Sequence, residues 1–283
     1  MNVLIIGGDG AIGSHLSRSL SSAGNNIVST TRNVKIASPS RPFLDISTIQ
    51  TGWRNSACDV AYICAAITST ANCEVNPRLT RRVNVEGALR VAQSIHNIGG
   101  FVVFLSTTLV FDGLTPYAQI DDPVSPTTEY GRQKAEVESA LIDMGNACCV
   151  RLGKVVSNKT VLFRHWIDAL RAGKPISAFT DLKMAPISMD ATAKLLQRVG
   201  EVRLSGTFHY TARDEISYFD AALMLSEMVN APSSLVQPTS ICNQSIESPK
   251  HTTLDCKATE LTFGANIPNS EEAINALVGS YCL

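Results

Sequence analysis

Asn2-Val-Leu-Ile-Ile6 runs directly into Gly7-Gly-Asp-Gly10-Ala-Ile-Gly13, and this stretch decides the fold. A short apolar run, a glycine turn and then leucines at helical spacing (Leu16, Leu20) predict a buried strand, a tight turn and a helix. Glycines in such a turn let the backbone approach a pyrophosphate closely, and the helix N-terminus favours its negative charge. We therefore expect a dinucleotide cofactor to be bound here; the alternative is a tight turn with a purely structural role. The expected cofactor-binding residues of the loop are Gly7, Gly10, Ala11, Ile12 and Gly13.

Apolar runs and helical patterns alternate along the first half of the chain. Further strands are predicted over residues 26–30, 59–64, 101–105 and 147–152, with one long helix over Glu74–Asn97 that is broken only at its start by Pro77. Alternation of this kind predicts an α/β protein with a Rossmann-like, doubly wound parallel sheet.

Beyond residue 152 the alternation loosens. Residues 231–256 are rich in Pro, Ser and Thr, which predicts a loop. We expect an NAD(P)-binding Rossmann domain at residues 1–152 and a smaller C-terminal substrate-binding lobe at residues 153–283, interleaved with the first. Asp190 is expected to be the N-cap of a helix over Ala191–Val199. The other helices predicted in this half are Thr160–Ala172, Ser217–Val229 and Ser270–Val278.

The residue that follows the second predicted strand usually distinguishes the two nicotinamide cofactors. An acidic residue there binds the ribose 2′-hydroxyl of NAD, whereas an arginine accommodates the 2′-phosphate of NADP. This strand runs into Thr31 and Arg32 with no carboxylate after it, which favours NADP(H) and leaves NAD(H) as the alternative. Further along, Phe43-Leu-Asp45-Ile46 predicts a short strand that ends in an acid. That acid either accepts a hydrogen bond from the adenine amino group or caps a helix from Ser47 onward.

Small and hydroxyl-bearing residues follow two other predicted strands. Ala65 and Ala66 end the third strand, where small side chains suit contact with a cofactor ribose and also suit plain packing. Ser106 and Thr107 end the fourth strand, at the carboxyl edge of the sheet where α/β folds bind ligands. Asn84 lies among apolar residues of the long predicted helix, and a buried amide needs a hydrogen-bond partner.

Ser125-Pro-Thr-Thr-Glu-Tyr130-Gly-Arg-Gln-Lys134 places a tyrosine and a lysine four residues apart after a proline-bearing turn. In a helix, positions i and i+4 stack on one face. An ammonium beside a phenol stabilises the phenolate and lowers the tyrosine pKa, so Tyr130 could exchange a proton with an alcohol or ketone near neutral pH. By itself this spacing is more typical of a solvated helix face, so the rest of the chain decides.

Composition narrows the function classes. The chain has 283 residues, a net charge of −1, 45% hydrophobic and 17% charged residues. The chain has no excess of basic residues that would favour nucleic acid or an anionic membrane as a partner. It has no apolar run long enough to span a bilayer, and no signal peptide is expected before the first strand. The eight cysteines form no Cys-x-x-Cys pair and the histidines show no zinc spacing, so no metal site is expected. The expected compartment is the cytoplasm.

Taken together, these motifs resemble the extended short-chain dehydrogenase/reductase superfamily, and most closely its dTDP-4-dehydrorhamnose reductase group. The similarity covers the glycine loop, Ala65–Val85, Ser106–Gly113 and Pro116–Glu136, and it continues faintly in Gly206–Ser217. Residues that differ from the group's pattern include Thr108-Leu109, Ile67 and Gln119, which fall near the expected substrate.

The resemblance implies a role for each matching residue. Thr107 takes the catalytic hydroxyl position, Tyr130 is the acid/base, and Lys134 is its partner and also binds the nicotinamide ribose. Asn84 matches the helix asparagine of the catalytic tetrad. Tyr130 and Lys134 are therefore expected both in catalysis and in cofactor binding, together with Arg32 and the other pocket residues named above.

The implied function is an NADP(H)-dependent oxidoreductase that reduces a keto group of a nucleotide-activated sugar. The implied partner is a small-molecule nucleotide sugar, and a homodimer is compatible with the chain. Two alternatives stay open: an NAD(P)-dependent nucleotide-sugar epimerase, which would hold its cofactor tightly without net turnover, and a non-catalytic NADP-binding regulatory protein. A dehydratase is disfavoured, because Thr108-Leu109 lacks the acid pair that such enzymes place beside the hydroxyl residue.

Overall fold

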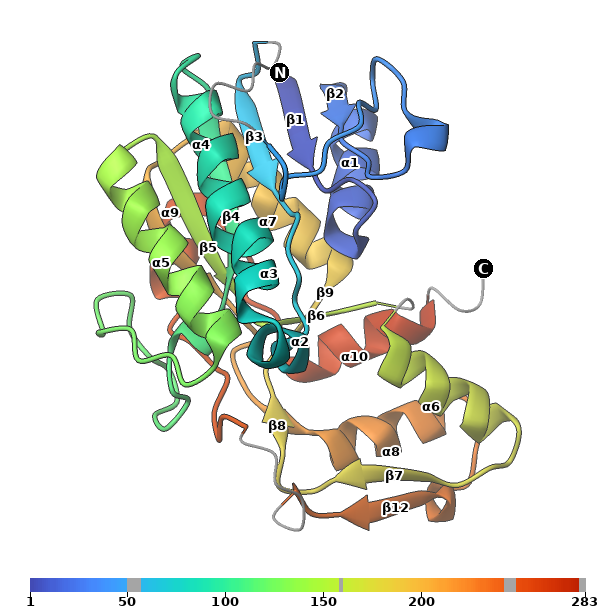
Figure 1. Cartoon of the computed structure of the whole chain (residues 1–283). Helices are drawn as coiled ribbons and strands as arrows, with labels where there is room; N and C mark the ends of the chain where they lie inside the picture. Colours follow the sequence, from blue (N-terminus) through green and yellow to red (C-terminus); the bar gives the residue numbers. More distant parts are fainter. Residues whose placement is uncertain (50–56, 158–159, 242–247, 280–283) are drawn as a thin grey trace.

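The computed structural model describes residues 1–49, 57–157, 160–241 and 248–279. Its centre is a six-stranded sheet with the order β2-β1-β3-β4-β5-β10, in which every neighbouring pair is parallel (Figure 1). The predicted Rossmann-like parallel sheet is confirmed. Its strands are β1 (Asn2–Ile6), β2 (Asn26–Ser29), β3 (Val60–Ile63), β4 (Phe101–Thr107), β5 (Ala147–Leu152) and β10 (Gly206–Tyr210).

Helices cover both faces of the sheet. Alternate strand residues face opposite sides, so Ile5 and Tyr62 pack against one set of helices, and Ile6 and Ile63 against the other. The first set comprises α1 (Ala11–Ser22), α7 (Met189–Val202) and α9 (Lys257–Phe263). The second comprises α4 (Ala88–His96) and α5 (Glu129–Met144), which lie in front of the strands in Figure 1.

The long helix predicted over Glu74–Asn97 is divided in the structure. Asn76 breaks it with φ −125° and ψ 55°, because Pro77 lacks an N–H and disfavours helical geometry in the residue before it. The parts are α2 (Thr70–Val75), α3 (Pro77–Arg81), the π-helical turn η2 (Arg82–Gly87) and α4. A Cβ on Gly87 would lie 2.4 Å from the Ile46 carbonyl oxygen, so this turn lets a neighbouring segment pass close by.

Three other local predictions were wrong. Residues 231–256, predicted as a loop, include the turn Ser233–Leu235 and the strand Val236–Thr239. Phe43–Ile46 forms no strand, only a single bridge between Thr31 and Phe43. Helix α7 begins two residues earlier than expected, and its N-cap is Ser188, whose Oγ accepts a hydrogen bond from the Ala191 N–H. Asp190 lies in the first turn instead, where its carboxylate is 2.8 Å from His15 Nε2 on α1. A carboxylate in a first turn is still favourable for the helix dipole.

A second lobe lies beyond the carboxyl edge of the sheet, at the bottom of Figure 1. Its core includes Phe163, Trp166 and Leu225, so Trp166 is a core residue. The sheet itself takes β10, and one of its covering helices α7, from the chain after residue 152, so the two segments interleave. None of the helices in the described part of the chain is both long and apolar enough to cross a membrane.

The lobe is built from short paired strands, three helices and connecting turns. The paired strands are β6 (Lys154–Val156) with β9 (Pro186–Ser188), β7 (Ile176–Phe179) with β12 (Val236–Thr239), and β8 (Lys183–Met184) with β11 (Ile216–Ser217). Its helices are α6 (Val161–Arg171), α8 (Tyr218–Met228) and α10 (Ser270–Gly279). Among the described residues, the 3₁₀ turns are η1 (Val34–Ile36), η3 (Thr108–Val110) and η4 (Ser233–Leu235).

Candidate cofactor and catalytic site

The glycine loop closes tightly between β1 and α1. The Gly10 N–H donates to the Gly7 carbonyl at 3.1 Å, and Gly7 has φ +87°. A Cβ on Gly7 would lie 2.7 Å from the Ala65 nitrogen, and one on Gly13 would lie 2.3 Å from the Gly7 oxygen. Only glycine fits at both positions. The loop therefore presents bare backbone and the start of α1 to the space above the sheet, which is the cradle that a pyrophosphate requires.

A pocket opens beside this loop, over the carboxyl ends of β1, β2 and β3. It brings together residues that are far apart in the sequence, and most of the expected cofactor-binding residues line it. Ala11, Ile12 and Gly13 follow the loop at the start of α1. The expected residues that line the pocket are Gly7, Gly10, Thr31, Arg32, Asp45, Ile46, Ala65 and Ala66.

Asp9, which sequence reasoning passed over, also lines the pocket. Its Oδ2 accepts hydrogen bonds from Thr31 Oγ1 at 2.7 Å and from the Arg32 N–H at 3.0 Å, and its Oδ1 pairs with Arg41 Nη2 at 2.6 Å. Partial burial opposes ionisation, but the hydrogen bonds from Arg41, Thr31 and the Arg32 N–H outweigh it and lower the pKa of this carboxyl. A carboxylate therefore does stand at the end of β2, supplied by another loop.

Asp45 combines pocket lining with a local structural role. Its Oδ1 accepts from the Ser47 N–H at 2.9 Å and from Ser47 Oγ at 2.7 Å. Residues 46–48 form a turn and a bend, so the alternative of a helix that begins at Ser47 is not found. The Ser47 hydroxyl is the main cause that lowers the Asp45 pKa, and the positive charge of Arg32 adds to it.

Tyr130 and Lys134 lie on successive turns of α5, as their spacing predicts. Thr128 caps this helix by accepting from the Gly131 N–H at 3.1 Å. Lys134 is buried, and its Nζ donates to the Leu105 carbonyl in β4 at 2.7 Å and lies 5.7 Å from the centre of the Tyr130 ring. Burial lowers the pKa of Lys134 to about 8.

The expected effect of Lys134 on the tyrosine is not found. Burial raises the pKa of Tyr130 well above its usual value, and Lys134 is not among the groups that shift it. The spacing revealed the helix neighbours but not how completely both side chains are enclosed. Tyr130 is therefore a neutral phenol at neutral pH, which suits a proton donor more than a proton acceptor.

Thr107 is the last residue of β4, and its Oγ1 accepts from the Leu109 N–H at 3.2 Å. Accepting that bond leaves the hydroxyl proton available to another acceptor. Thr107 and Leu105, whose carbonyl holds Lys134, are alternate residues of one strand. The end of β4 thus connects the hydroxyl position with the lysine of α5.

Asn84 has the hydrogen-bond partners that its burial requires. Its Oδ1 accepts from the Ile67 N–H at 2.7 Å, and its Nδ2 donates to the Ile67 carbonyl at 2.9 Å and to Gln133 Oε1 at 2.8 Å. Asn84 therefore fixes the backbone beside Ala66 in the pocket wall and ties it to α5. These bonds give it a positioning contact rather than a contact with Lys134.

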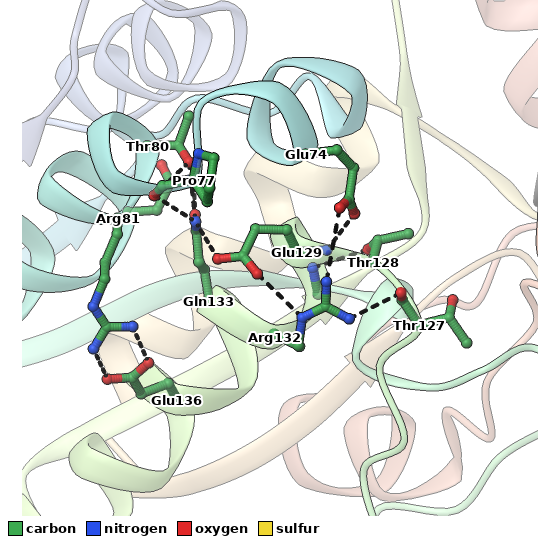
Figure 2. A network of polar contacts seen from close by, with 12 residues as sticks. Glu74, Pro77, Thr80, Arg81, Thr127, Thr128, Glu129, Arg132, Gln133 and Glu136 are labelled. Carbon is green, nitrogen blue, oxygen red and sulfur yellow. Dashed lines mark hydrogen bonds and ion pairs between the residues drawn. The ribbon is translucent and has the colours of Figure 1, made fainter.

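Gln133 continues this polar network between α3 and α5, which Figure 2 shows. Its Nε2 donates to Thr80 Oγ1 at 3.0 Å and to Glu129 Oε1 at 2.9 Å. Glu129 also pairs with Arg132 at 3.1 Å. Arg81 pairs with Glu136 through its two terminal guanidinium nitrogens, Nη1 and Nη2 (Figure 2). Sequence reasoning missed this network, because its members look like ordinary surface residues of two helices.

A buried ion pair supports α5 from the side of the sheet, and it was also missed. Arg151 of β5 donates to Glu138 of α5 at 2.8 Å, and both side chains are at most 6% exposed. Arg151 Nη1 lies 3.1 Å from His209 Nε2 in β10, and the Phe111 ring packs on the guanidinium. Burial, with Arg151 nearby, lowers the pKa of His209 to about 4.

The second lobe carries three basic residues, Lys154, Arg164 and His165, for which a solvated position is more expected than contact with a substrate diphosphate. Arg164 and His165 are exposed on α6. Lys154 is half-buried at the start of β6, where its Nζ donates to the Tyr218 hydroxyl at 2.9 Å. In the described part of the chain, no group of three or more metal-ligating side chains comes together.

Comparison with known proteins identifies the family of this chain. The family model described as "RmlD substrate binding domain" matches residues 1–282. The chain belongs to this family. A relative from Haloferax volcanii, a probable low-salt glycan biosynthesis reductase, is 27% identical over 79% of this chain and 78% of its own length. A dTDP-4-dehydrorhamnose reductase of Sinorhizobium fredii is 27% identical over 89% of this chain and 91% of its own.

Solved structures share the fold of this RmlD-family chain. A dTDP-4-dehydrorhamnose reductase from Clostridium acetobutylicum covers 100% of both chains with a TM-score of 0.89 at 22% identity. Two others carry a nicotinamide cofactor. The Bacillus anthracis reductase in complex with NADP has a TM-score of 0.86 at 21% identity, covering 99% of this chain and 98% of its own. MoeE5 in complex with UDP-glucose and NAD has a TM-score of 0.84 at 19% identity, covering 100% and 99%.

Proposed function

We propose that this chain is an NAD(P)-dependent oxidoreductase that reduces a keto group of a nucleotide-activated sugar. The observation that carries the proposal is the position of Tyr130 and Lys134 on successive turns of α5, with Lys134 bonded to the same strand that ends in Thr107. The glycine cradle follows β1 of the same parallel sheet, and it suits the pyrophosphate of a dinucleotide. Relatives named as dTDP-4-dehydrorhamnose reductases favour the 4-keto position of the sugar.

The cofactor would be held by the glycine loop, the start of α1 and the pocket walls, and it would supply the hydride. Arg32 in the pocket wall follows β2, the place from which an arginine would meet the 2′-phosphate of NADP(H). Ala65 and Ala66 leave room for a ribose beside the loop. The same walls suit NAD(H), because the two cofactors differ only at the 2′ position of the adenosine ribose.

Charge control falls to this chain's own residues. When a carbonyl carbon is reduced, negative charge develops on its oxygen, and hydroxyl donors aimed at that oxygen stabilise the charge. Thr107 and Tyr130 would donate these hydrogen bonds, and Tyr130 would deliver its proton. The raised pKa of Tyr130 keeps its proton in place across neutral pH, so it is ready as an acid for reduction. Lys134, bonded to the Leu105 carbonyl of β4, would hold α5 and so keep Tyr130 in position.

Substrate would enter from the side of the second lobe. In open α/β sheets, ligands bind outside the carboxyl ends of the strands, and the lobe lies beyond that edge (Figure 1). Lys154 at the start of β6 is a candidate for an anionic group of the nucleotide sugar. We propose the cytoplasm as the location.

The experiment is a Tyr130→Phe variant assayed with NADH and NADPH on 4-keto nucleotide sugars. We expect cofactor binding, followed by fluorescence, to stay within about twofold of the native protein. Turnover should fall roughly 10²–10⁴-fold, the usual worth of a general acid. Tyr210→Phe is the matched control, because the Tyr210 hydroxyl donates to the Asn266 carbonyl at 3.1 Å and takes no part in the proposed chemistry.

The alternatives give different results in the same experiment. An epimerase would convert its sugar without net loss of reduced cofactor. A regulatory protein would bind cofactor but turn over none of the sugars, and Tyr130→Phe would change nothing. A Phe variant with a near-native rate would remove Tyr130 from the mechanism.

A further inference from the structure

We propose that Asp9 is a specificity-determining residue that disfavours the 2′-phosphate of NADP(H) and so lets the pocket accept NAD(H). The proposal rests on the proposed function, because it takes the pocket beside the glycine loop to be the nicotinamide cofactor site. It adds a residue that the usual rule, which considers only the position after β2, does not consider.

Asp9 occupies the hydrogen-bond donors that a 2′-phosphate would use. A 2′-phosphate is bound at the end of the second strand by the residues that follow it. In this structure the Thr31 hydroxyl and the Arg32 N–H both donate to Asp9 Oδ2, at 2.7 and 3.0 Å. A phosphate at this place would have to displace the carboxylate from both bonds.

The charges around Asp9 also disfavour a 2′-phosphate. Arg41 Nη2 pairs with Asp9 Oδ1 at 2.6 Å, and the charge of Arg32 acts on Asp45 strongly enough to help lower its pKa. In and beside the pocket, the charge of Arg41 is thus paired with Asp9, and that of Arg32 lies near Asp45. A phosphate dianion needs surplus positive charge, and like charges held close together repel. The 2′-hydroxyl of NAD(H) has no such requirement.

A carboxylate at this position also favours a ribose 2′-hydroxyl. An acid near the end of the second strand accepts a hydrogen bond from the ribose 2′-hydroxyl. Asp9 is held there by three donors and is 40% exposed in its side chain, so it has acceptor capacity left on the pocket side. The same carboxylate thus favours binding of a 2′-hydroxyl and disfavours binding of a 2′-phosphate.

The test is a direct measurement of cofactor affinity, without turnover. Dissociation constants for NADH and NADPH are measured by fluorescence titration on the native chain and on Asp9→Asn, which keeps the shape and removes the charge. The native chain should bind NADH at least as tightly as NADPH. The variant should shift the ratio of the two constants toward NADPH by about tenfold or more, equivalent to at least 1.4 kcal/mol.

Two further variants make the result decisive. Asp59→Asn is the matched control: the Asp59 carboxylate accepts from the Asn2 N–H at the amino end of the sheet, so the ratio should not move. Asp9→Ser, which keeps an acceptor for the Arg32 N–H, serves if Asp9→Asn does not fold, and it should shift the ratio in the same direction.

The outcomes separate this inference from the proposed function. If both cofactors bind and neither Asp9 variant moves the ratio, Asp9 does not select and the inference is overturned alone. A native chain that binds NADPH clearly better than NADH overturns it as well. If the native chain binds neither cofactor, the proposed function falls and takes the inference with it.

Discussion

Replacing Lys134 by methionine should stabilise the protein while destroying its proposed activity. Burial lowers the pKa of Lys134 from 10.5 to about 8. Holding this side chain charged at pH 7 therefore costs the folded state roughly 3 kcal/mol, since each pKa step of one corresponds to about 1.4 kcal/mol. Methionine removes that cost and fills a similar volume. Loss of the hydrogen bond to the Leu105 carbonyl offsets about 1 kcal/mol, so the expected net gain is about 2 kcal/mol.

The stability difference between the Lys134→Met variant and the native protein should depend on pH. Below about pH 8, Lys134 is charged in both the folded and unfolded states, and the native protein carries the full cost. Between pH 8 and 10.5 the folded state loses its proton first, so the unfolded state binds more protons and native stability rises with pH by about 1.4 kcal/mol per pH unit. The advantage of the Lys134→Met variant should therefore shrink to about zero by roughly pH 9.5.

Urea unfolding at pH 7 and 9.5, followed by circular dichroism, measures both free energies of unfolding. Lys194→Met on α7 is the control, because Lys194 is exposed and its replacement should change stability little at either pH. An Lys134→Met variant that is destabilised at pH 7, or whose difference from the native protein is the same at both pH values, would refute the argument from burial.

Two further predictions concern the cradle and the buried ion pair. Gly13→Ala should abolish measurable cofactor binding in a fluorescence titration, because its Cβ would lie 2.3 Å from the Gly7 oxygen; Gly24→Ala, strained only by φ +81°, should bind normally and lose only stability. Arg151→Met should lower the free energy of unfolding in urea by about 3–5 kcal/mol, because it leaves the buried Glu138 carboxylate unpaired. Adding Glu138→Leu should restore most of that loss, and a double variant as unstable as the single one would contradict it.

The central sheet could be predicted because its signals are local. The apolar run Asn2–Ile6 and the glycines after it specify a strand, a turn and a helix within a few residues of one another. The edge strand β10 carries no such signal. Gly206–Tyr210 is short, and its position depends on pairing with β5, which lies more than fifty residues earlier. Sequence patterns report such pairing weakly, so β10 was missed as part of the sheet.

The parts of the site that could not be predicted depend on contacts across the chain. Asp9 meets Thr31 and Arg41 across separations of 22 and 32 residues. Nothing in the loop itself indicates that its carboxylate turns toward the end of β2. Likewise, the spacing of Tyr130 and Lys134 gives their common helix face but not their burial, and burial decides the direction of both pKa shifts.

Helix α5 brings these results together, because three separate contacts hold it. Lys134 bonds to the Leu105 carbonyl of β4, Glu138 pairs with Arg151 of β5, and Gln133 joins it to Asn84 on the opposite side. Each bond is buried, so a shift of the helix would break several at once and leave charges unpaired. A proton donor works best when it is fixed at the reacting position by its surroundings. The lysine that makes the fold less stable at pH 7 is thus one of the contacts that keep Tyr130 in place.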